Sequence, residues 1–134
     1  MNAADRDSVR RRAGHRCEYC GLRQEHYLVR SHQIEHIIPI KHGGSDALTN
    51  LALSCIRCNL GKGPNLSGID SKTGEIVELF HPRRQIWAEH FALVVAEVVG
   101  LTPCGRATVS VLNMNEERRY RLRQALLEAG ELDV

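Results

Sequence analysis

Aromatic residues and long apolar runs are scarce in this chain. Only 4% of its 134 residues are aromatic, with a single tryptophan and two phenylalanines. A chain of this length is about one domain, and a core with so few aromatic side chains gains from a metal or covalent staple. We find no run of about 18 apolar residues, and no leader with a charged start, an apolar middle and a small-residue cleavage site. We therefore expect one soluble, cytoplasmic domain over residues 1–134, with no membrane partner.

A large excess of charge of either sign is also lacking, since 18 Lys and Arg residues stand against 16 Asp and Glu residues. The arginines are nevertheless unevenly distributed. One block lies near the start and includes Arg10, Arg11 and Arg12, and another lies near the end, at Arg118, Arg119, Arg121 and Arg123. Both blocks are compatible with phosphate contacts, although a solvated helix face is the simpler interpretation of each block taken alone.

The first half of the chain mixes helical and strand patterns. Residues 3–13 form an amphipathic pattern that predicts a short helix ending at Gly14. Residues 27–29 and 34–38 are β-like, and Pro39 ends the second of these segments. The run KHGGSDALTN predicts a loop, and after it LAL leads to a helix over about residues 55–61 that a glycine ends.

The second half predicts more strand than helix. A turn is expected around residues 71–74, followed by a strand over 76–80. Two β-branched runs, at 92–99 and 107–112, are separated by GLTPCG and predict a hairpin. Asn115 is a candidate cap for a last helix, whose apolar stripe consists of Leu122, Ala125, Leu126 and Ala129.

Four of the five cysteines form two C-x-x-C pairs, Cys17 with Cys20 and Cys55 with Cys58. This spacing lets both sulfurs of a pair face one tetrahedral ion, so a structural zinc ion held by four cysteines is the simplest interpretation. The alternatives are a secreted disulfide pair, which lacks a leader here, and a thioredoxin-like redox motif, which does not need two pairs. Cys104 stands alone and is interpreted as a small apolar residue or an idle thiol.

The run IEHIIPIKHGGSDALTNLALSCIRCNLGKG carries a more specific pattern. An acid and a histidine precede two aliphatic residues and a proline, and a Gly-Gly loop, Asn-Leu, Cys-x-x-Cys, an asparagine and a lysine follow in order. The run resembles the HNH endonucleases of the His-Me finger superfamily. The resemblance covers residues 17–63 and extends more loosely through GIDSKTGEIVELFHPRRQIWAEHF and GRATVSVLNMN.

The resemblance implies a two-stranded hairpin and a helix that grip one divalent ion. By its motif positions, His36 is the general base, Glu35 and Asn59 are ligands of the ion, and Asn50 ties the loop and orients the base. A neutral imidazole can accept a proton from water near neutral pH. Carboxylate and amide oxygens suit Mg²⁺ or Mn²⁺, and asparagine rather than histidine at position 59 favours magnesium.

The expected partner is DNA, whose phosphodiester bonds such an enzyme hydrolyses. Arg57 and Lys62, beside the metal, are candidate phosphate contacts, together with Arg10, Arg11 and Arg12 of the first basic block. His32 and His42 lie near the site but occupy no motif position, so a structural role is expected for both.

Two interpretations of the function of this chain stay open. Taken alone, His36 reads as a core histidine, Asn50 as a loop residue and Asn59 as a helix-end residue, but the joint order and spacing favour the nuclease. The alternative is a zinc-stapled module that binds nucleic acid without cleaving it. The predicted fold is α+β, a ββα-metal finger over 17–63 stapled by zinc. An N-terminal helical segment over 3–16 precedes the finger, and a strand-rich extension over 64–134 follows it and ends in a helix.

Overall fold

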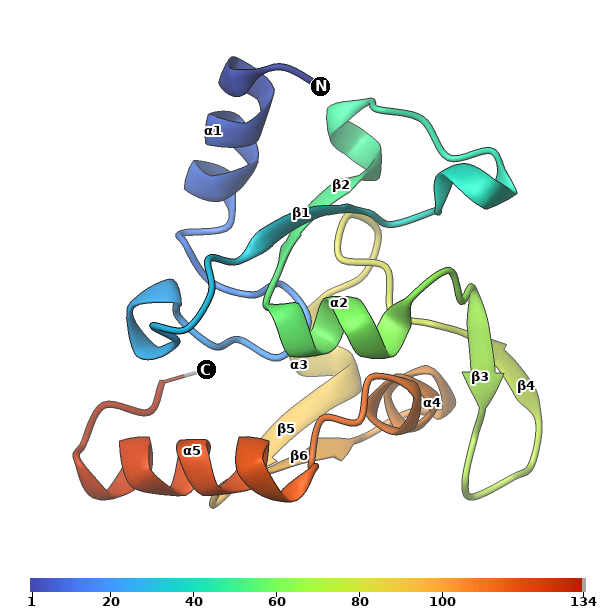
Figure 1. Cartoon of the computed structure of the whole chain (residues 1–134). Coiled ribbons are helices and arrows are strands. Elements are labelled where there is room, and N and C mark those ends of the chain that lie inside the picture. The colour runs from blue at the N-terminus through green and yellow to red at the C-terminus, as the bar shows by residue number, and fades with distance from the viewer. Residues whose placement is uncertain (134) are drawn as a thin grey trace.

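The computed structural model describes residues 1–133, which form a mixed helix and strand fold built from small two-stranded sheets (Figure 1). The helices are α1 (Ala3–Arg12), α2 (Ile56–Lys62), α3 (Trp87–His90), α4 (Pro103–Val111) and α5 (Glu117–Glu128). The strands are β1 (Gln33–His36), β2 (Leu51–Ser54), β3 (Ser67–Ile69), β4 (Ile76–Glu78), β5 (Phe91–Val94) and β6 (Glu97–Gly100). Each of the three sheets is one antiparallel pair of consecutive strands. None of the helices among these residues is both long and apolar enough to cross a bilayer.

The β1–β2 hairpin and the helix α2 that follows it form the expected ββα unit (Figure 1). In the hairpin Glu35 pairs with Ala52 and His36 pairs with Leu51. The strand β2 is buried along its whole length, and α1 packs against it through Val9, which lies with Leu51 in a small apolar cluster. The fold class predicted from the sequence is confirmed, as is the helix that ends before Gly14.

A larger apolar core lies beneath the hairpin and joins both halves of the chain. Its buried members run from Cys17 and Tyr19 through Phe80 and Phe91 to Met114. Phe80 and Phe91 contact each other edge to face, with ring centroids 5.2 Å apart, and Trp87 stacks on Phe91. Four of the six aromatic residues of the chain, Tyr19, Phe80, Trp87 and Phe91, thus lie in or against this core, where they pack with aliphatic side chains.

The β-branched run at residues 107–112 forms a helix, so the hairpin predicted between it and residues 92–99 is wrong. The hairpin instead lies inside the first run, where β5 and β6 are joined at Val95 and Ala96. Thr102 caps α4 by accepting a hydrogen bond from the backbone N–H of Gly105 at 3.0 Å, and Pro103 occupies the first turn. These two residues are a standard helix start, and burial of one face of α4 outweighs the weak helix propensity of valine and threonine.

Three smaller predictions also need correction. Residues 27–29 form no strand; a 3₁₀ turn at Gln24–His26 precedes them. The helix α2 runs on to Lys62 rather than ending at residue 61. Asn115 does not cap α5, whose first turn is preceded by Glu116, because its amide side chain is bonded to the backbone of Val98. The turn at residues 71–74 and the strand beginning at residue 76 are confirmed, although β4 is shorter than expected and its partner β3 was not foreseen.

Candidate metal and catalytic site

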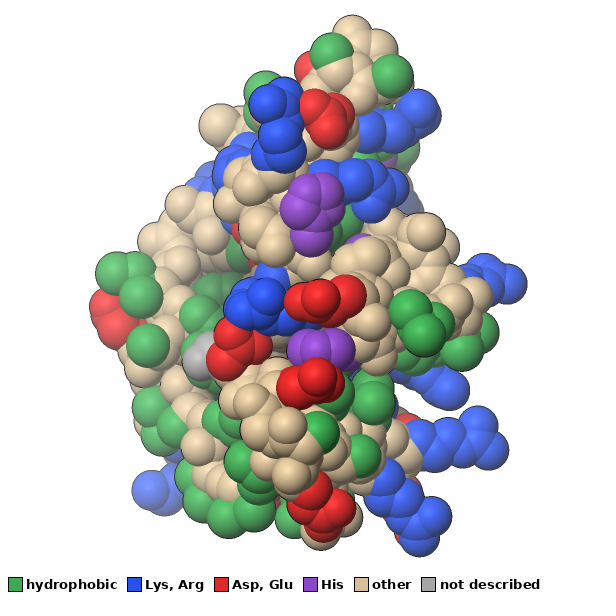
Figure 2. Space-filling model, turned by 90° about the vertical axis from the view of Figure 1, so that its left-hand side faces the viewer, with side chains coloured by type: hydrophobic (Ala, Val, Ile, Leu, Met, Phe, Trp, Pro, Cys, Tyr) green, Lys and Arg blue, Asp and Glu red, His purple; other side chains and the backbone are tan. Residues whose placement is uncertain are grey.

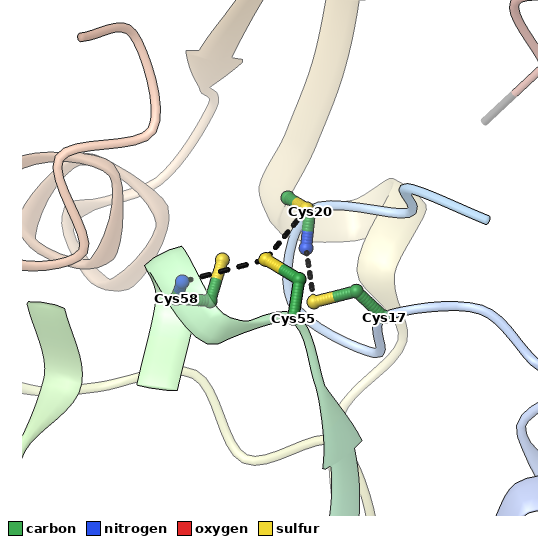
Figure 3. A group of neighbouring side chains, drawn as sticks. All are labelled: Cys17, Cys20, Cys55 and Cys58. Atoms are coloured by element: carbon green, nitrogen blue, oxygen red, sulfur yellow. Dashed lines mark hydrogen bonds between the residues drawn. The ribbon is translucent and has the colours of Figure 1, made fainter. Parts of the chain in front are cut away.

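The four paired cysteines converge on one point (Figure 3). Cys17 and Cys20 lie on the loop that follows α1, Cys55 is the N-cap of α2, and Cys58 lies in its first turn. All four are buried and free, and their sulfur atoms lie within 4.8 Å of one another. The Sγ atoms of Cys20 and Cys55 are 3.8 Å apart, and a tetrahedron with zinc–sulfur bonds of about 2.3 Å has edges of about 3.8 Å. The cluster therefore fits a structural zinc ion.

Arg119 of α5 contributes a buried positive charge to this cluster. Its guanidinium donates to Cys58 Sγ at 2.9 Å, and a second nitrogen donates to the carbonyl of Leu112 at 2.7 Å. Burial alone lowers the pKa of Arg119, but the surrounding cysteines, Cys58 foremost, raise it above its ordinary value. Four thiolates around a divalent ion carry a net negative charge, so a cation at hydrogen-bond distance suits them.

The Glu35 carboxylate faces inward from β1 and is nearly closed off from solvent, at 6% exposure. Its Oε1 accepts a hydrogen bond from the hydroxyl of Tyr19, and its Oε2 lies 3.6 Å from Lys62 Nζ. Burial raises the pKa of Glu35, while the neighbouring Lys62 ammonium and the Tyr19 hydroxyl oppose that rise. Burial also raises the pKa of Tyr19, so its hydroxyl remains a donor at neutral pH.

Lys62 is not available for the phosphate contact expected from the sequence, which is a correction. Only 2% of its side chain is exposed, and its ammonium donates to the carbonyl of Ile37 at 2.9 Å and to that of His36 at 3.4 Å. With Glu35 as a third partner, this buried cation joins the last turn of α2 to the end of β1. It therefore fixes the backbone on which both Glu35 and His36 are carried.

Asn59 lies one helical turn before Lys62 and also faces β1. Its side-chain amide donates to the side-chain oxygen of Gln33. In a strand, side chains two residues apart lie on the same face, so Gln33 and Glu35 both face α2. The structure thus places Asn59 and Glu35 on facing surfaces of α2 and β1, each offering a hard oxygen atom.

His36 lies at the end of β1 with its imidazole partly exposed, at 19%. Its Nε2 is 2.7 Å from Asp46 Oδ1, and this contact is the main cause that lowers the pKa of Asp46. An ionised carboxylate can only accept, so Nε2 carries the proton of this contact, and in a neutral imidazole the free lone pair is then on Nδ1. His36 is therefore not a core histidine.

Asn50 holds the loop that carries Asp46. Its amide nitrogen donates to the carbonyls of Ile38 and Ser45 at 3.0 and 2.8 Å, while its oxygen accepts from the N–H of Ile38 at 2.9 Å. Gly44 passes so close that a Cβ there would lie 1.7 Å from the carbonyl oxygen of Ile38. The tie expected of Asn50 thus has a geometric basis; Gly44 is needed for close approach of the backbone, and Gly43 adopts a positive φ of 86°.

The first basic block is largely committed to the protein itself. Arg10 donates to the carbonyl of His32 at 3.0 Å, and Arg12 donates to those of Leu48 and Leu51 at 2.9 and 2.6 Å. Arg11 is exposed and pairs with Asp7 at 2.8 Å. Arg10 and Arg12 therefore anchor α1 to the hairpin, and their expected role in DNA binding is not supported. Arg57 is exposed on α2, as a phosphate contact requires.

The face shown in Figure 2 carries basic, acidic and histidine side chains side by side near its centre. Near the chain end, Asp133 pairs with Arg16 and Arg23, and His26 Nε2 lies 3.7 Å from a carboxylate oxygen of Glu131. The charges along this part of the surface are therefore balanced within the protein.

His32 and His42 have the structural roles expected of them. His32 is buried, with Nε2 at 2.8 Å from the carbonyl of Leu22, and His42 Nε2 lies 3.1 Å from the carbonyl of Pro64. Sequence reasoning missed Tyr19, Asp46 and Arg119. Tyr19 stands inside the first cysteine pair and Asp46 directly after Gly-Gly-Ser, but neither position by itself indicates which distant side chain it will meet.

The comparison with protein families agrees with this geometry. A family model described as HNH endonuclease matches residues 17–65. No curated protein and no solved structure matches the chain. The matched segment begins at the first zinc-type cysteine and contains Glu35, His36, Asn50 and Asn59. Residues 17–65, which contain the cluster of four cysteines, therefore match the HNH endonuclease family.

Proposed function

We propose that this protein is a metal-dependent endonuclease that hydrolyses DNA phosphodiester bonds. The observation that carries the proposal is the placement of a partly exposed imidazole, His36, beside two facing oxygen donors, Glu35 and Asn59, inside the segment that matches the family. A base and a divalent-ion site on adjoining residues are what hydrolysis of a phosphodiester requires.

His36 is the general base of this proposal. Asp46 fixes the imidazole through Nε2, which leaves the lone pair of Nδ1 to take a proton from the attacking water. The Asn50 hydrogen bonds hold the loop on which Asp46 lies, so the orientation of the imidazole depends on Asn50 through Asp46.

Glu35 and Asn59 hold the divalent ion. The Tyr19 hydroxyl orients the Glu35 carboxylate, and the Lys62 ammonium favours its ionised form in a buried setting. The amide nitrogen of Asn59 is occupied by Gln33, so its oxygen is the atom that remains to serve as a ligand. When bound, Mg²⁺ or Mn²⁺ would neutralise charge on the scissile phosphate and on the leaving oxygen.

One observation favours a second candidate, a zinc-stapled module that binds DNA without cleaving it. The Lys62 ammonium already places a positive charge 3.6 Å from Glu35. If that charge satisfies the carboxylate completely, no divalent ion is needed there, and the domain keeps its fold without catalysis.

Cleavage of supercoiled plasmid by zinc-replete protein, with Mg²⁺ or Mn²⁺ titrated over a wide range, tests the proposal. His36→Ala removes the base but no ligand, so cleavage should fall by about two orders of magnitude or more at every ion concentration. Glu35→Gln and Asn59→Ala weaken ion binding, so part of their loss should be recovered as the ion concentration rises. Arg118→Ala, an exposed change on α5, is the matched control and should cleave like the parent.

The two candidates give opposite results. A parent protein that binds DNA but nicks no plasmid with either ion is the non-cleaving module. A folded His36→Ala variant that cleaves at the parent rate refutes the assignment of the base, whatever the ion does.

A further inference from the structure

A surface groove of about 440 Å³ begins beside the candidate site and includes none of its proposed catalytic groups except Asn50. One wall consists of Ile38, Asn50 and the Gly-Gly loop, and the other consists of His81, Arg83 and Arg84. Among the described residues, no Asp or Glu lines this groove. Its charged lining is therefore entirely basic.

The first wall is continuous with the hairpin that carries the base. Ile38 follows His36 by two residues, and its backbone N–H and its backbone carbonyl are both hydrogen-bonded to the Asn50 side chain. The backbone carbonyl of Asn50 accepts from the N–H of Ile37 at 2.8 Å. A polymeric substrate with one repeating unit bound at His36 must extend over the surface beside His36, and this first wall forms part of that surface.

The second wall is a rigid turn. The N–H groups of Arg84 and Gln85 both donate to the carbonyl of His81, and the Gln85 side chain accepts from the N–H of His81 at 2.8 Å. Arg83 forms an ion pair with Glu18, which lies inside the first cysteine pair, so this turn is anchored to the zinc-type cluster. Burial lowers the pKa of Arg83 to about 10, which leaves it charged at neutral pH.

Arg84 differs from its neighbour in having no fixed partner. Its side chain is exposed, and within residues 1–133 it forms no ion pair. Arg83 is committed to Glu18, and in the first basic block Arg10 and Arg12 are committed to backbone carbonyls. An arginine presented by a rigid turn, without an acid beside it, is suited to bind an anion from solution.

We propose that this groove holds the sugar-phosphate backbone of duplex DNA next to the cleavage site, with Arg84 contacting a phosphate. The proposal rests on the function proposed above and adds a binding surface to it. The groove offers a cation together with small polar residues such as Ser45 and Thr49, rather than large apolar side chains. That lining suits a phosphate backbone, which is read by charge and shape, better than it suits an apolar peptide.

The test compares Arg84→Ala and Arg84→Glu with Arg118→Ala, which removes an exposed arginine of α5 outside the groove. Affinity for a duplex oligonucleotide is measured by fluorescence anisotropy over a salt series, with zinc-replete protein and no added Mg²⁺ or Mn²⁺. Loss of one phosphate contact should reduce the slope of log affinity against log salt by about 0.9 and weaken binding up to about fivefold at moderate salt. Arg84→Glu should weaken binding more than Arg84→Ala, and Arg118→Ala should match the parent.

Plasmid cleavage by the same proteins separates the two proposals. If the parent binds and cleaves DNA but both Arg84 variants keep its affinity and slope, the groove assignment is wrong and the nuclease assignment stands. If the parent neither binds nor cleaves, both fail together. A reduced slope for Arg84→Ala, with the melting temperature unchanged, supports the groove.

Discussion

Replacing Arg119 by methionine tests how far the C-terminal helix stabilises the cysteine cluster. Methionine fills much of the same volume but cannot donate to Cys58, Leu112 or Asn113, whose acceptor atoms lie 2.9, 2.7 and 3.2 Å from the guanidinium. Removal of one partner of a buried charged pair costs about 3 to 5 kcal/mol, since the other partner stays buried. Small domains are stable by about 5 to 15 kcal/mol, so the variant should fold but melt about 10 to 20 °C lower.

Zinc retention gives a second and more specific readout. Groups that hydrogen-bond to metal ligands typically change metal affinity by about 10- to 100-fold when removed. Competition with a chromogenic chelator should therefore strip Arg119→Met at about tenfold lower chelator concentration than the parent. Arg119→Lys, which keeps the charge, should fall between them, and Arg118→Met controls for a change at the adjacent exposed position. Equal retention by parent and Arg119→Met would show that this guanidinium contributes nothing to the metal site.

Two further predictions concern stability. Cys20→Ala should lose zinc and its cooperative unfolding transition, whereas Cys104→Ser, at a half-buried thiol outside the cluster, should do neither; zinc content and thermal melts decide. Arg106, whose Nε is 2.6 Å from Asp70 Oδ1, holds the pKa of Asp70 well below its usual value. The stabilisation of the folded state by this ion pair is complete above the unfolded pKa of Asp, about 4, and declines as the pH falls toward the lower folded pKa. Asp70→Asn should therefore be less stable than the parent at pH 7 and should lose less stability than the parent between pH 4 and pH 2.

The metal finger was predictable because its metal ligands and catalytic residues occur at short, fixed spacings in the sequence. Two C-x-x-C pairs fix the sulfurs of each pair at one face of a turn, and Cys55 at the start of α2 combines the roles of ligand and helix cap. The adjacent pair Glu35 and His36 must face opposite sides of a strand, and the structure has the carboxylate buried and the imidazole partly exposed. Strand alternation determines that the two side chains lie on opposite faces.

The arginines show what spacing does not determine. Charge runs indicate that a cation is present, but its direction depends on partners far along the chain. Arg123 is buried because it donates to the carbonyl of Ala96, in the turn of the β5–β6 hairpin, at 2.6 Å and to that of Met114, between α4 and α5, at 2.8 Å. Arg119 is buried because Cys58, 61 positions away, offers a sulfur. The sequence of a basic block indicates neither the hydrogen-bond partners of Arg123 nor that of Arg119.

The extension was harder to predict for a related reason. Valine and threonine in ATVSVL favour strands by local propensity, and only the cap and proline before them indicate a helix. What decides the outcome is tertiary: Thr108 is fully buried, accepts from the N–H of Phe80 at 2.9 Å and donates to the carbonyl of Cys104 at 2.7 Å. A helix here satisfies groups that a strand would leave unpaired.

These contacts bear on whether the finger and the extension are separable, and we propose that they are a single domain. The indole N–H of Trp87 donates to the carbonyl of Tyr19 at 2.7 Å, and Tyr19 in turn donates to the proposed ligand Glu35. Arg119 reaches the zinc-type cluster from the other side. Because the extension contacts the cysteine cluster directly and the proposed ion site at Glu35 through Tyr19, the geometry of each depends on the packing of residues that lie outside the family match.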